Sequence, residues 1–251
     1  TSPGGKPART WAGLLVAQVR EWLPAFRSVF SRLASQPADT GQPARKVGAG
    51  SSARLAATAL IAMAASFGAS AQTVQLSFLY DSFAGAGSQL SFNGNAQING
   101  TELRLTPALG GQAGSAFNTE RVQFSADYSF SSYFTFRMLD PGGGGGDGMT
   151  FTIQTSSNSS VSPGGGLGYQ GIPNSLAVEF DSYANGVLES EAHVAINING
   201  DVSHSVFTVG DGYYADATTF TADFADTAVY HAWIDYNGVT GTLELRLAKN
   251  T

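Results

Sequence analysis

Cysteine is absent from this chain of 251 residues. The fold therefore has no disulfide and no thiol chemistry, and its stability must come from a sizeable core or from bound metal. Charged residues are also scarce, at 13% of the sequence, whereas glycine occurs 31 times. Few charges and many glycines are typical of turn-rich β proteins rather than of helical ones. The composition therefore favours an all-β fold.

Basic residues are scarce beyond residue 54. Eight of the 13 Lys and Arg residues lie in residues 1–54, with only two of the 19 acidic residues. From Gln72 onward, five basic residues stand against 17 acidic ones, a formal net charge of −12. A surface of this sign repels phosphate backbones, so no nucleic acid partner is expected. The longest glycine run, residues 142–146, also lacks the lysine that ends a phosphate-binding loop.

Residues 1–50 differ in character from the rest. Apolar residues recur at helical spacing from Ala12 to Ser35, with arginines between them, and Pro24 interrupts the pattern. This predicts a kinked or broken helix, with a membrane-surface helix as its functional alternative. Residues 36–52 are polar and rich in Pro and Gly, which indicates a flexible stretch. Residues 1–50 are therefore interpreted as a leader or a disordered or helical extension.

A secretory signal is predicted at residues 51–71. Basic residues precede the apolar run Leu55–Phe67, which is too short to span a bilayer, and the small residues Ala69-Ser70-Ala71 follow it. This order of segments predicts cleavage between Ala71 and Gln72. The mature chain is then expected to be secreted, or periplasmic or at the cell surface, with no transmembrane span.

Short strand patterns fill the chain from Thr73 onward, separated by Gly, Asn, Asp, Ser and Pro. Many short strands with regular turn signals and no convincing helix favour a β-sandwich or barrel. The predicted strands are residues 74–80, 97–104, 122–138, 149–155, 176–180, 194–198, 205–209, 229–236 and 242–247.

Two of these strands, in the stretch Leu176–Asp201, carry polar side chains on one face. Alternation places Glu179, Asp181, Tyr183 and Asn185 on one side of the first strand, opposite its apolar residues. In the second strand His193 and Asn197 share the polar face. Carboxylate and amide oxygens suit calcium, and carboxylates with imidazole suit a transition metal ion. The alternative is a strand pair with an ordinary solvated polar face.

Four segments resemble the L-type (legume-type) lectin family, and they occur in the family's order across residues 74–247. The metal-site segment is Val178-Glu179-Phe180-Asp181-Ser182-Tyr183-Ala184-Asn185 followed by His193-Val194-Ala195-Ile196. The others are Gly145-Gly146-Asp147-Gly148-Met149-Thr150-Phe151, Gly164-Gly165-Gly166-Leu167-Gly168-Tyr169 and Tyr230-His231-Ala232-Trp233-Ile234-Asp235-Tyr236. One such motif is weak, whereas four in order are specific.

The resemblance implies a jelly-roll (concanavalin-like) sandwich of antiparallel sheets over residues 72–251. The family continues beyond a strand such as Thr242–Leu247 with further strands, whereas this sequence stops at Thr251. The sandwich is therefore expected to be incomplete at its C-terminus, lacking its last strands. Either the sequence is a fragment, or a partner strand completes the fold.

The resemblance also implies a carbohydrate site. Asp147 supplies the carboxylate, Asn185 the amide and Gly165 the backbone donor, while Tyr183 stacks on the sugar or offers its carbonyl to calcium. A cis peptide is implied between Gly146 and Asp147.

The implied metal ions are Ca²⁺ and Mn²⁺ or another transition metal. Calcium is assigned to Asp181, the Tyr183 carbonyl and Asn185, and the second ion to Glu179, Asp181 and His193. The family completes the second site with an Asp, but this chain has Leu-Glu-Ser-Glu-Ala at that place. Glu189 is the nearest replacement and Glu191 the second.

The expected function is calcium-dependent binding of a monosaccharide unit of a glycan or polysaccharide, without chemistry. A metal-free structural or adhesive domain is one alternative. A jelly-roll glycoside hydrolase is another, since such enzymes use Glu-x-Asp-x-Glu on one strand. Tyr183 stands here in place of the third acid, which argues against catalysis. Weak single sites need several copies for avidity, so an oligomer is compatible with this function.

Overall fold

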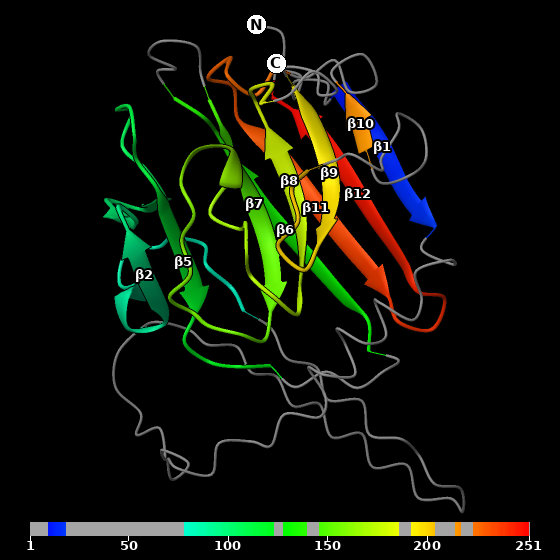
Figure 1. Cartoon of the computed structure of the whole chain (residues 1–251), viewed down its shortest axis with the longest axis horizontal. Helices are drawn as coiled ribbons and strands as arrows, with labels where there is room; N and C mark the ends of the chain where they lie inside the picture. The colour runs from blue at the N-terminus through cyan, green and yellow to red at the C-terminus, as the bar shows by residue number, and fades with distance from the viewer. Residues whose placement is uncertain are drawn as a thin grey trace, which may run out of the picture.

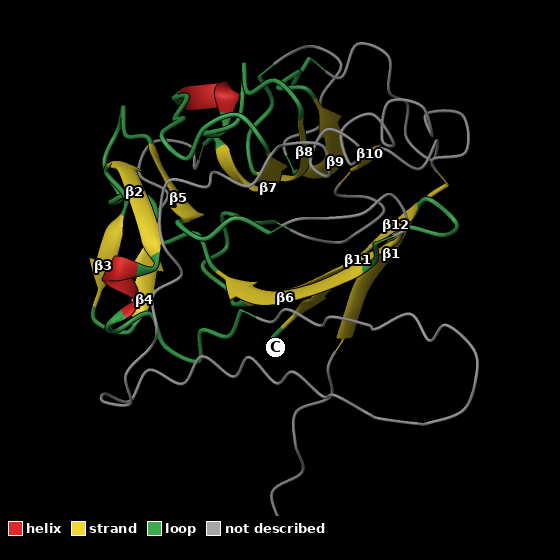
Figure 2. Cartoon of the chain, turned by 90° about the horizontal axis from the view of Figure 1, so that it is seen from below, coloured by secondary structure: helices red, strands yellow, loops and turns green. Residues whose placement is uncertain are grey.

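Two four-stranded antiparallel sheets face each other as a sandwich (Figures 1 and 2). The computed structural model describes residues 10–18, 78–122, 128–139, 146–185, 192–203, 214–216 and 223–250. One sheet has the order β1 (Thr10–Gln18), β12 (Thr242–Lys249), β11 (Tyr230–Asn237), β6 (Phe130–Phe136). The other has the order β10 (Tyr214–Asp216), β9 (His193–Ile198), β8 (Ser175–Asp181), β7 (Gly148–Gln154). The predicted all-β jelly-roll sandwich is confirmed.

Two smaller sheets flank the sandwich on the β7 side (Figures 1 and 2). One pairs β2 (Leu90–Gly94) with β5 (Gly114–Asn118), and the other pairs β3 (Gln97–Asn99) with β4 (Glu102–Arg104). The helical elements in the described part are two 3-10 turns, η2 (Ala86–Ser88) and η3 (Gly164–Gly166). Within the described residues, no helix has the length and apolar character needed to cross a bilayer.

The main core lies between the two sheets and follows from strand alternation. In β8, Leu176, Val178 and Phe180 point into the sandwich, and all three are at most 1% exposed. Each large apolar side chain buried in this way stabilises the fold by about 1.5–3 kcal/mol. The facing sheet contributes alternate residues of β11 and β12, namely Tyr230, Ala232, Ile234, Tyr236, Leu243, Leu245 and Leu247.

The register of the second sheet gathers the polar residues at one end of β8. Asp181 pairs with His193 across β8 and β9, and with Gly148 across β8 and β7. Asp147, directly before β7, is thereby brought next to the end of β8. The neighbouring strands thus bring together residues that lie up to 46 positions apart, from Asp147 to His193.

The helix predicted from Ala12 is wrong for residues 12–18. These residues lie in β1, which pairs antiparallel with β12 from Thr10↔Lys249 to Gln18↔Thr242. The edge of β12 offers a row of unpaired backbone donors and acceptors, which the apolar spacing of residues 12–18 does not reflect. Pairing with that row overrides the local preference for a helix. The remainder of the predicted helix, residues 19–35, lies outside the described residues, as does the predicted signal at 51–71.

Several strand boundaries also differ from the prediction. The strand expected over residues 97–104 is a hairpin, because Gly100 takes a positive φ of 64° between β3 and β4. Residues 78–80 are not in a strand, and β6 begins only at Phe130. The strands β2, β5 and β10 were not predicted, and β2 and β5 are rich in Ser, Asn and Gly. The strand expected at 205–209 lies outside the described residues.

A broad cleft of about 3050 Å³ opens between the flanking sheets and the edges of β6 and β7. Among the described strands, β6 pairs only with β11, and β7 only with β8. Phe130, Phe134 and Phe151 line this cleft and pack against the main core, and they are only partly buried. The sandwich is thus tightly packed around β8 and looser along the β6 and β7 edges.

Candidate functional site

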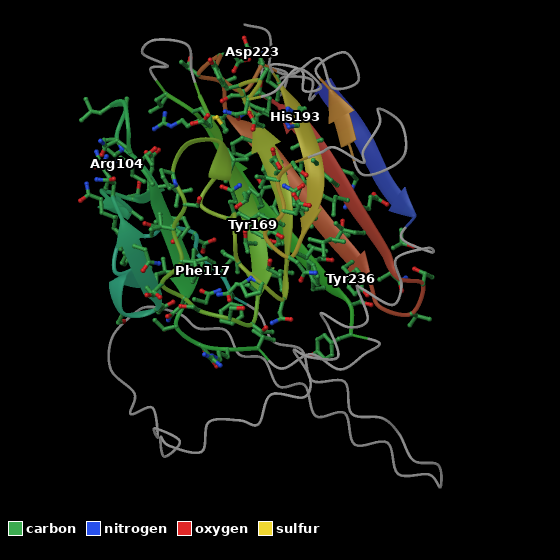
Figure 3. All side chains as sticks on the ribbon, viewed as in Figure 1. Arg104, Phe117, Tyr169, His193, Asp223 and Tyr236 are labelled. Carbon is green, nitrogen blue, oxygen red and sulfur yellow. The ribbon has the colours of Figure 1, made fainter. Side chains whose placement is uncertain are left out.

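Three ionisable side chains meet in the interior at the shared end of β8 and β9. Glu179, Asp181 and His193 are each at most 2% exposed, and each offers a ligand atom within 4.8 Å of the others. His193 Nε2 lies 3.2 Å from Glu179 Oε1. Figure 3 shows His193 at the start of β9, of which it is the first residue. Buried carboxylates are rare unless they are paired or hold a metal ion.

The donor set and its spacing fit a divalent cation. Two carboxylates and an imidazole are ligands that zinc, manganese and related ions accept, and ligand atoms this close together can share one ion. Glu189 and Glu191, predicted to complete the set, lie outside the described residues. The cluster therefore fits the sequence prediction for Glu179, Asp181 and His193, and the fourth acid stays a prediction.

Asn197 fixes the orientation of Glu179 and was not predicted as a site residue. Its amide Nδ2 donates a short hydrogen bond to Glu179 Oε2, while Oε1 of the same carboxylate faces His193. Asn197 is fully buried, and its Oδ1 has no hydrogen-bond partner among the described residues. The sequence alternation already placed Asn197 on the same face of its strand as His193. Only the β8–β9 register shows that its amide meets the carboxylate of Glu179.

A second group of residues meets just beyond the end of β8, where Asn185 contacts Asp147 and Gly165. Asn185 Nδ2 donates to Asp147 Oδ1 over 2.9 Å. Gly165 lies against the same amide, since a Cβ on Gly165 would stand 2.7 Å from Asn185 Cγ. Only glycine fits there without displacing Asn185. The predicted cis peptide between Gly146 and Asp147 is confirmed.

Tyr183 connects the two groups. Its backbone N–H donates to Asp181 Oδ1 over 2.6 Å, and its side chain is 45% exposed. The ring covers Gly146, where a Cβ would stand 3.0 Å from Tyr183 Cγ. Ser182 adds a link, because its N–H and its hydroxyl both donate to the Asp147 carbonyl, over 2.8 and 2.9 Å. The end of β8 therefore fixes the position of Asp147 through backbone contacts.

One cavity of about 340 Å³ touches both groups, through Glu179 and Asp181 of the first and through Asn185 and Gly165 of the second. Its lining combines the glycine loop with residues of both groups, namely Pro163, Gly165, Gly166, Gln170, Glu179, Asp181, Asn185 and Val202. The size is in the range of small-ligand sites. Two carboxylates, an amide and the glycine loop thus converge on a common space that is large enough for an ion and for polar ligand groups.

The glycine loop is held by Tyr169, a further residue that the prediction missed. Tyr169 is fully buried over the sheet formed by β7, β8 and β9 (Figure 3). Gly200 N–H donates to Tyr169 Oη over 2.9 Å, and Ser175 Oγ lies 3.1 Å from the same oxygen. Burial, opposed by these hydrogen bonds, raises the pKa of Tyr169 to about 12. Its phenol is therefore a neutral, structural group at physiological pH.

Comparison with known proteins finds similarity to L-type lectin-domain containing receptor kinases. The chain is 31% identical over 189 residues to the L-type lectin-domain containing receptor kinase I.7 of Arabidopsis thaliana, covering 69% of this chain and 28% of the kinase. It is also 31% identical over 197 residues to the L-type lectin-domain containing receptor kinase SIT2 of Oryza sativa subsp. japonica, covering 68% and 28%. The chain thus spans less than a third of the length of these relatives.

Among solved structures, the exoplasmic/lumenal domain of VIP36 in its Ca²⁺/Man-bound form aligns with a TM-score of 0.44 and 16% sequence identity. This alignment covers 68% of this chain and 82% of the VIP36 chain. Residues 75–251, which include every strand of the sandwich except β1, match the legume lectin domain family. Because this match covers more than half of the chain, the chain is a member of the legume lectin domain family.

Proposed function

We propose that residues 72–251 form a secreted lectin domain that binds a monosaccharide unit of a glycan in a calcium-dependent manner, without chemistry. The observation that supports this most directly is the contact of Asn185 with both Asp147 and Gly165. These residues come from three separate stretches of the chain. Their convergence supplies a carboxylate acceptor, an amide and a backbone donor within one space, which is what two adjacent sugar hydroxyls require.

The proposed sugar contacts follow from these atoms. Asp147 accepts hydrogen bonds from two hydroxyls, the amide of Asn185 and the backbone N–H of Gly165 donate to sugar oxygens, and the half-exposed ring of Tyr183 packs on the C–H face. Such a small monovalent site binds weakly, near millimolar or about −4 kcal/mol. Useful avidity would come from several copies.

The proposed calcium ligands are Asp181, Asn185 and the backbone carbonyl of Tyr183. A bound calcium ion orders oxygen ligands by electrostatic attraction, which couples metal binding to the shape of the sugar site. A second ion, Mn²⁺ or another transition metal, is assigned to Glu179, Asp181 and His193, with Glu189 or Glu191 completing its ligands. Asp181 would contact both ions, so the two sites would share one carboxylate.

Two single substitutions test the assignment. Asp147→Ala is expected to abolish detectable sugar binding, because a lost charge-assisted bond costs about 1.5–3 kcal/mol and leaves hydroxyls unpaired. Calcium affinity should stay at the parent value, since Asp147 is not a proposed ligand. Asn185→Ala should weaken both sugar and calcium. Calorimetry of each variant with calcium and with simple hexoses, using Asp235→Ala on the other sheet as a control, measures both affinities.

Glycan-array binding with and without chelator separates the alternatives. A lectin of the proposed kind loses its signal in chelator and regains it with calcium. Persistent binding in chelator would point to the metal-free adhesive domain, and release of smaller sugars from the array would point to a hydrolase. Sugar affinity unchanged in Asp147→Ala would show that the sugar site lies elsewhere in the fold.

A further inference from the structure

The loop that carries Gly165 has little regular structure of its own. Between Ser162 and Ile172 the chain makes turn-like hydrogen bonds, such as Gly168 N–H to the Ser162 carbonyl over 2.8 Å. The regular element inside it is the three-residue turn Gly164–Gly166. A glycine-rich loop of this kind loses more backbone entropy on ordering than other sequences do. Its position over the site must therefore be fixed by contacts with neighbouring elements.

Tyr169 makes these contacts through a single oxygen. Gly200, in the turn after β9, donates its N–H to Tyr169 Oη over 2.9 Å. Ser175, the first residue of β8, places Oγ 3.1 Å from the same oxygen and donates to the Ile172 carbonyl over 2.5 Å. The phenol thus joins the loop to the start of β8 and to the end of β9.

The packing around Tyr169 is separate from the main core. Tyr169 packs with Ile172 and Ala177 in a small buried cluster, with Phe117 and Val202 partly buried at its margin. Ala177 lies on the same face of β8 as Glu179, two residues along the strand. This cluster therefore lies between the loop and the sheet, directly beside the cavity that Val202 and Gly165 both line.

The backbone of Tyr169 is hydrogen-bonded to Gly166, the residue that follows the proposed sugar donor Gly165. Tyr169 N–H donates to the Gly166 carbonyl over 2.8 Å, and Gln170 N–H donates to the same carbonyl over 2.8 Å. Gly166 follows Gly165 directly, and Gly165 lies against the Asn185 amide. A change in the position of Tyr169 is thus passed through the Gly166 carbonyl to the turn Gly164–Gly166, which carries the N–H of Gly165 that is proposed to donate to sugar.

We propose that Tyr169 is a positioning residue for carbohydrate recognition: its buried hydroxyl locks the glycine loop so that Gly165 stands beside Asn185 and Asp147. The inference rests on the proposed sugar site. Tyr169 does not touch the ligand. It holds the donor peptide in place before the ligand arrives, so that little ordering entropy is lost on binding.

The test replaces Tyr169 with Phe and uses Tyr230→Phe as a matched control. Both tyrosines are fully buried, and both hydroxyls are hydrogen-bonded, but Tyr230 Oη binds Asp226 and the Asp223 carbonyl in the other sheet region. Tyr169→Phe should lower sugar affinity roughly three- to tenfold, as expected for one neutral hydrogen bond. Calcium affinity should stay unchanged. Tyr230→Phe should lower the melting temperature, because it also removes a buried hydroxyl, and should leave sugar affinity unchanged.

Peptide-level hydrogen exchange gives a readout that is independent of sugar. In Tyr169→Phe, exchange should accelerate across residues 163–172, whereas β8 and β11 should keep their protection. Parent-like exchange in this loop would overturn the inference, as would equal losses of sugar affinity in the two Phe variants. If the parent chain binds no sugar, the proposed function and the positioning role both fail. If Asp147→Ala abolishes binding while Tyr169→Phe binds like the parent, the inference alone fails.

Discussion

At the level of single residues, the carboxylate of Glu179 is held from two sides. His193 faces Oε1, and the amide of Asn197 caps Oε2. Such outer contacts orient metal ligands, and their loss lowers metal affinity by about 10–100-fold. At the proposed transition-metal site, we therefore expect Asn197→Ala to weaken binding of the ion within that range, because Glu179 would lose one of the two contacts that orient its carboxylate.

The matched control is Asn237→Ala. Asn237 also makes two side-chain contacts, accepting hydrogen bonds from the Val239 and Thr240 amides, but it is exposed at the end of β11. Manganese titration by calorimetry should give the parent affinity for Asn237→Ala and a reduced one for Asn197→Ala. Equal affinities in both variants would show that Glu179 is oriented without Asn197.

Asp226 should give the fold an acid-sensitive anchor. Burial favours its neutral form, but hydrogen bonds from Lys249, the Ala228 N–H and Tyr230 outweigh burial and lower its pKa. The folded carboxyl therefore holds its proton less tightly than the unfolded one. Its stabilisation is complete above the unfolded pKa of about 3.9 and is lost as pH falls through the lower folded pKa. Asp226→Asn should lower the melting temperature at pH 7 and change it much less at pH 3.

At the level of elements, β1 closes the β12 edge of its sheet. The ladder runs the whole length of β12, with a register shift between Trp11 and Gly13. Proline cannot donate to such a ladder. The double variant Leu14→Pro/Leu15→Pro removes two successive backbone donors and should release β1. Amide exchange should then accelerate at alternate residues of β12, those that face β1, while the amides that pair with β11 remain protected.

The double variant Leu14→Ala/Leu15→Ala keeps both backbone donors and serves as the control. It should show parent-like exchange along β12. If the two proline substitutions leave the exchange of β12 unchanged, β1 does not protect this edge in solution. Residue-resolved exchange by NMR is required, because the expected signature is alternation along one strand.

At the level of the whole molecule, we propose that export removes residues 1–71. The basic segment, the apolar run Leu55–Phe67 and Ala69-Ser70-Ala71 motivate this division. The family match over residues 75–251 begins just beyond the proposed cleavage point. N-terminal sequencing of exported protein should therefore read Gln72-Thr73-Val74. An exported chain that begins at Thr1 would contradict the proposal.

This proposal changes the environment of β12. Cleavage after Ala71 removes β1, so β12 becomes an edge strand of the exported domain. An exposed edge strand can pair with strands of other chains unless the edge strand is short or carries charged side chains. Glu244, Arg246 and Lys249 place charges along β12, and the Arg246 guanidinium pairs with Glu244 over 3.1 Å. These charges oppose uncontrolled edge pairing in the mature domain.

Much of the fold followed from the sequence, for a local physical reason. Side chains alternate in a strand, so the apolar parity of Leu176, Val178 and Phe180 determined which face of β8 is buried. The same parity placed Glu179 and Asp181 together on the other face. The cis peptide before Asp147 was implied by the family resemblance and not by any local pattern.

Tertiary structure decided the features that depend on long-range approach. Residues 10–18 became a strand because the edge of β12 offered partners, which local spacing does not record. The β8–β9 register decided that Asn197 meets Glu179, and the fold of the glycine loop decided that Tyr169 reaches Gly200. Sequence alternation determines the face on which a residue lies, whereas pairing register and loop path determine what that residue touches.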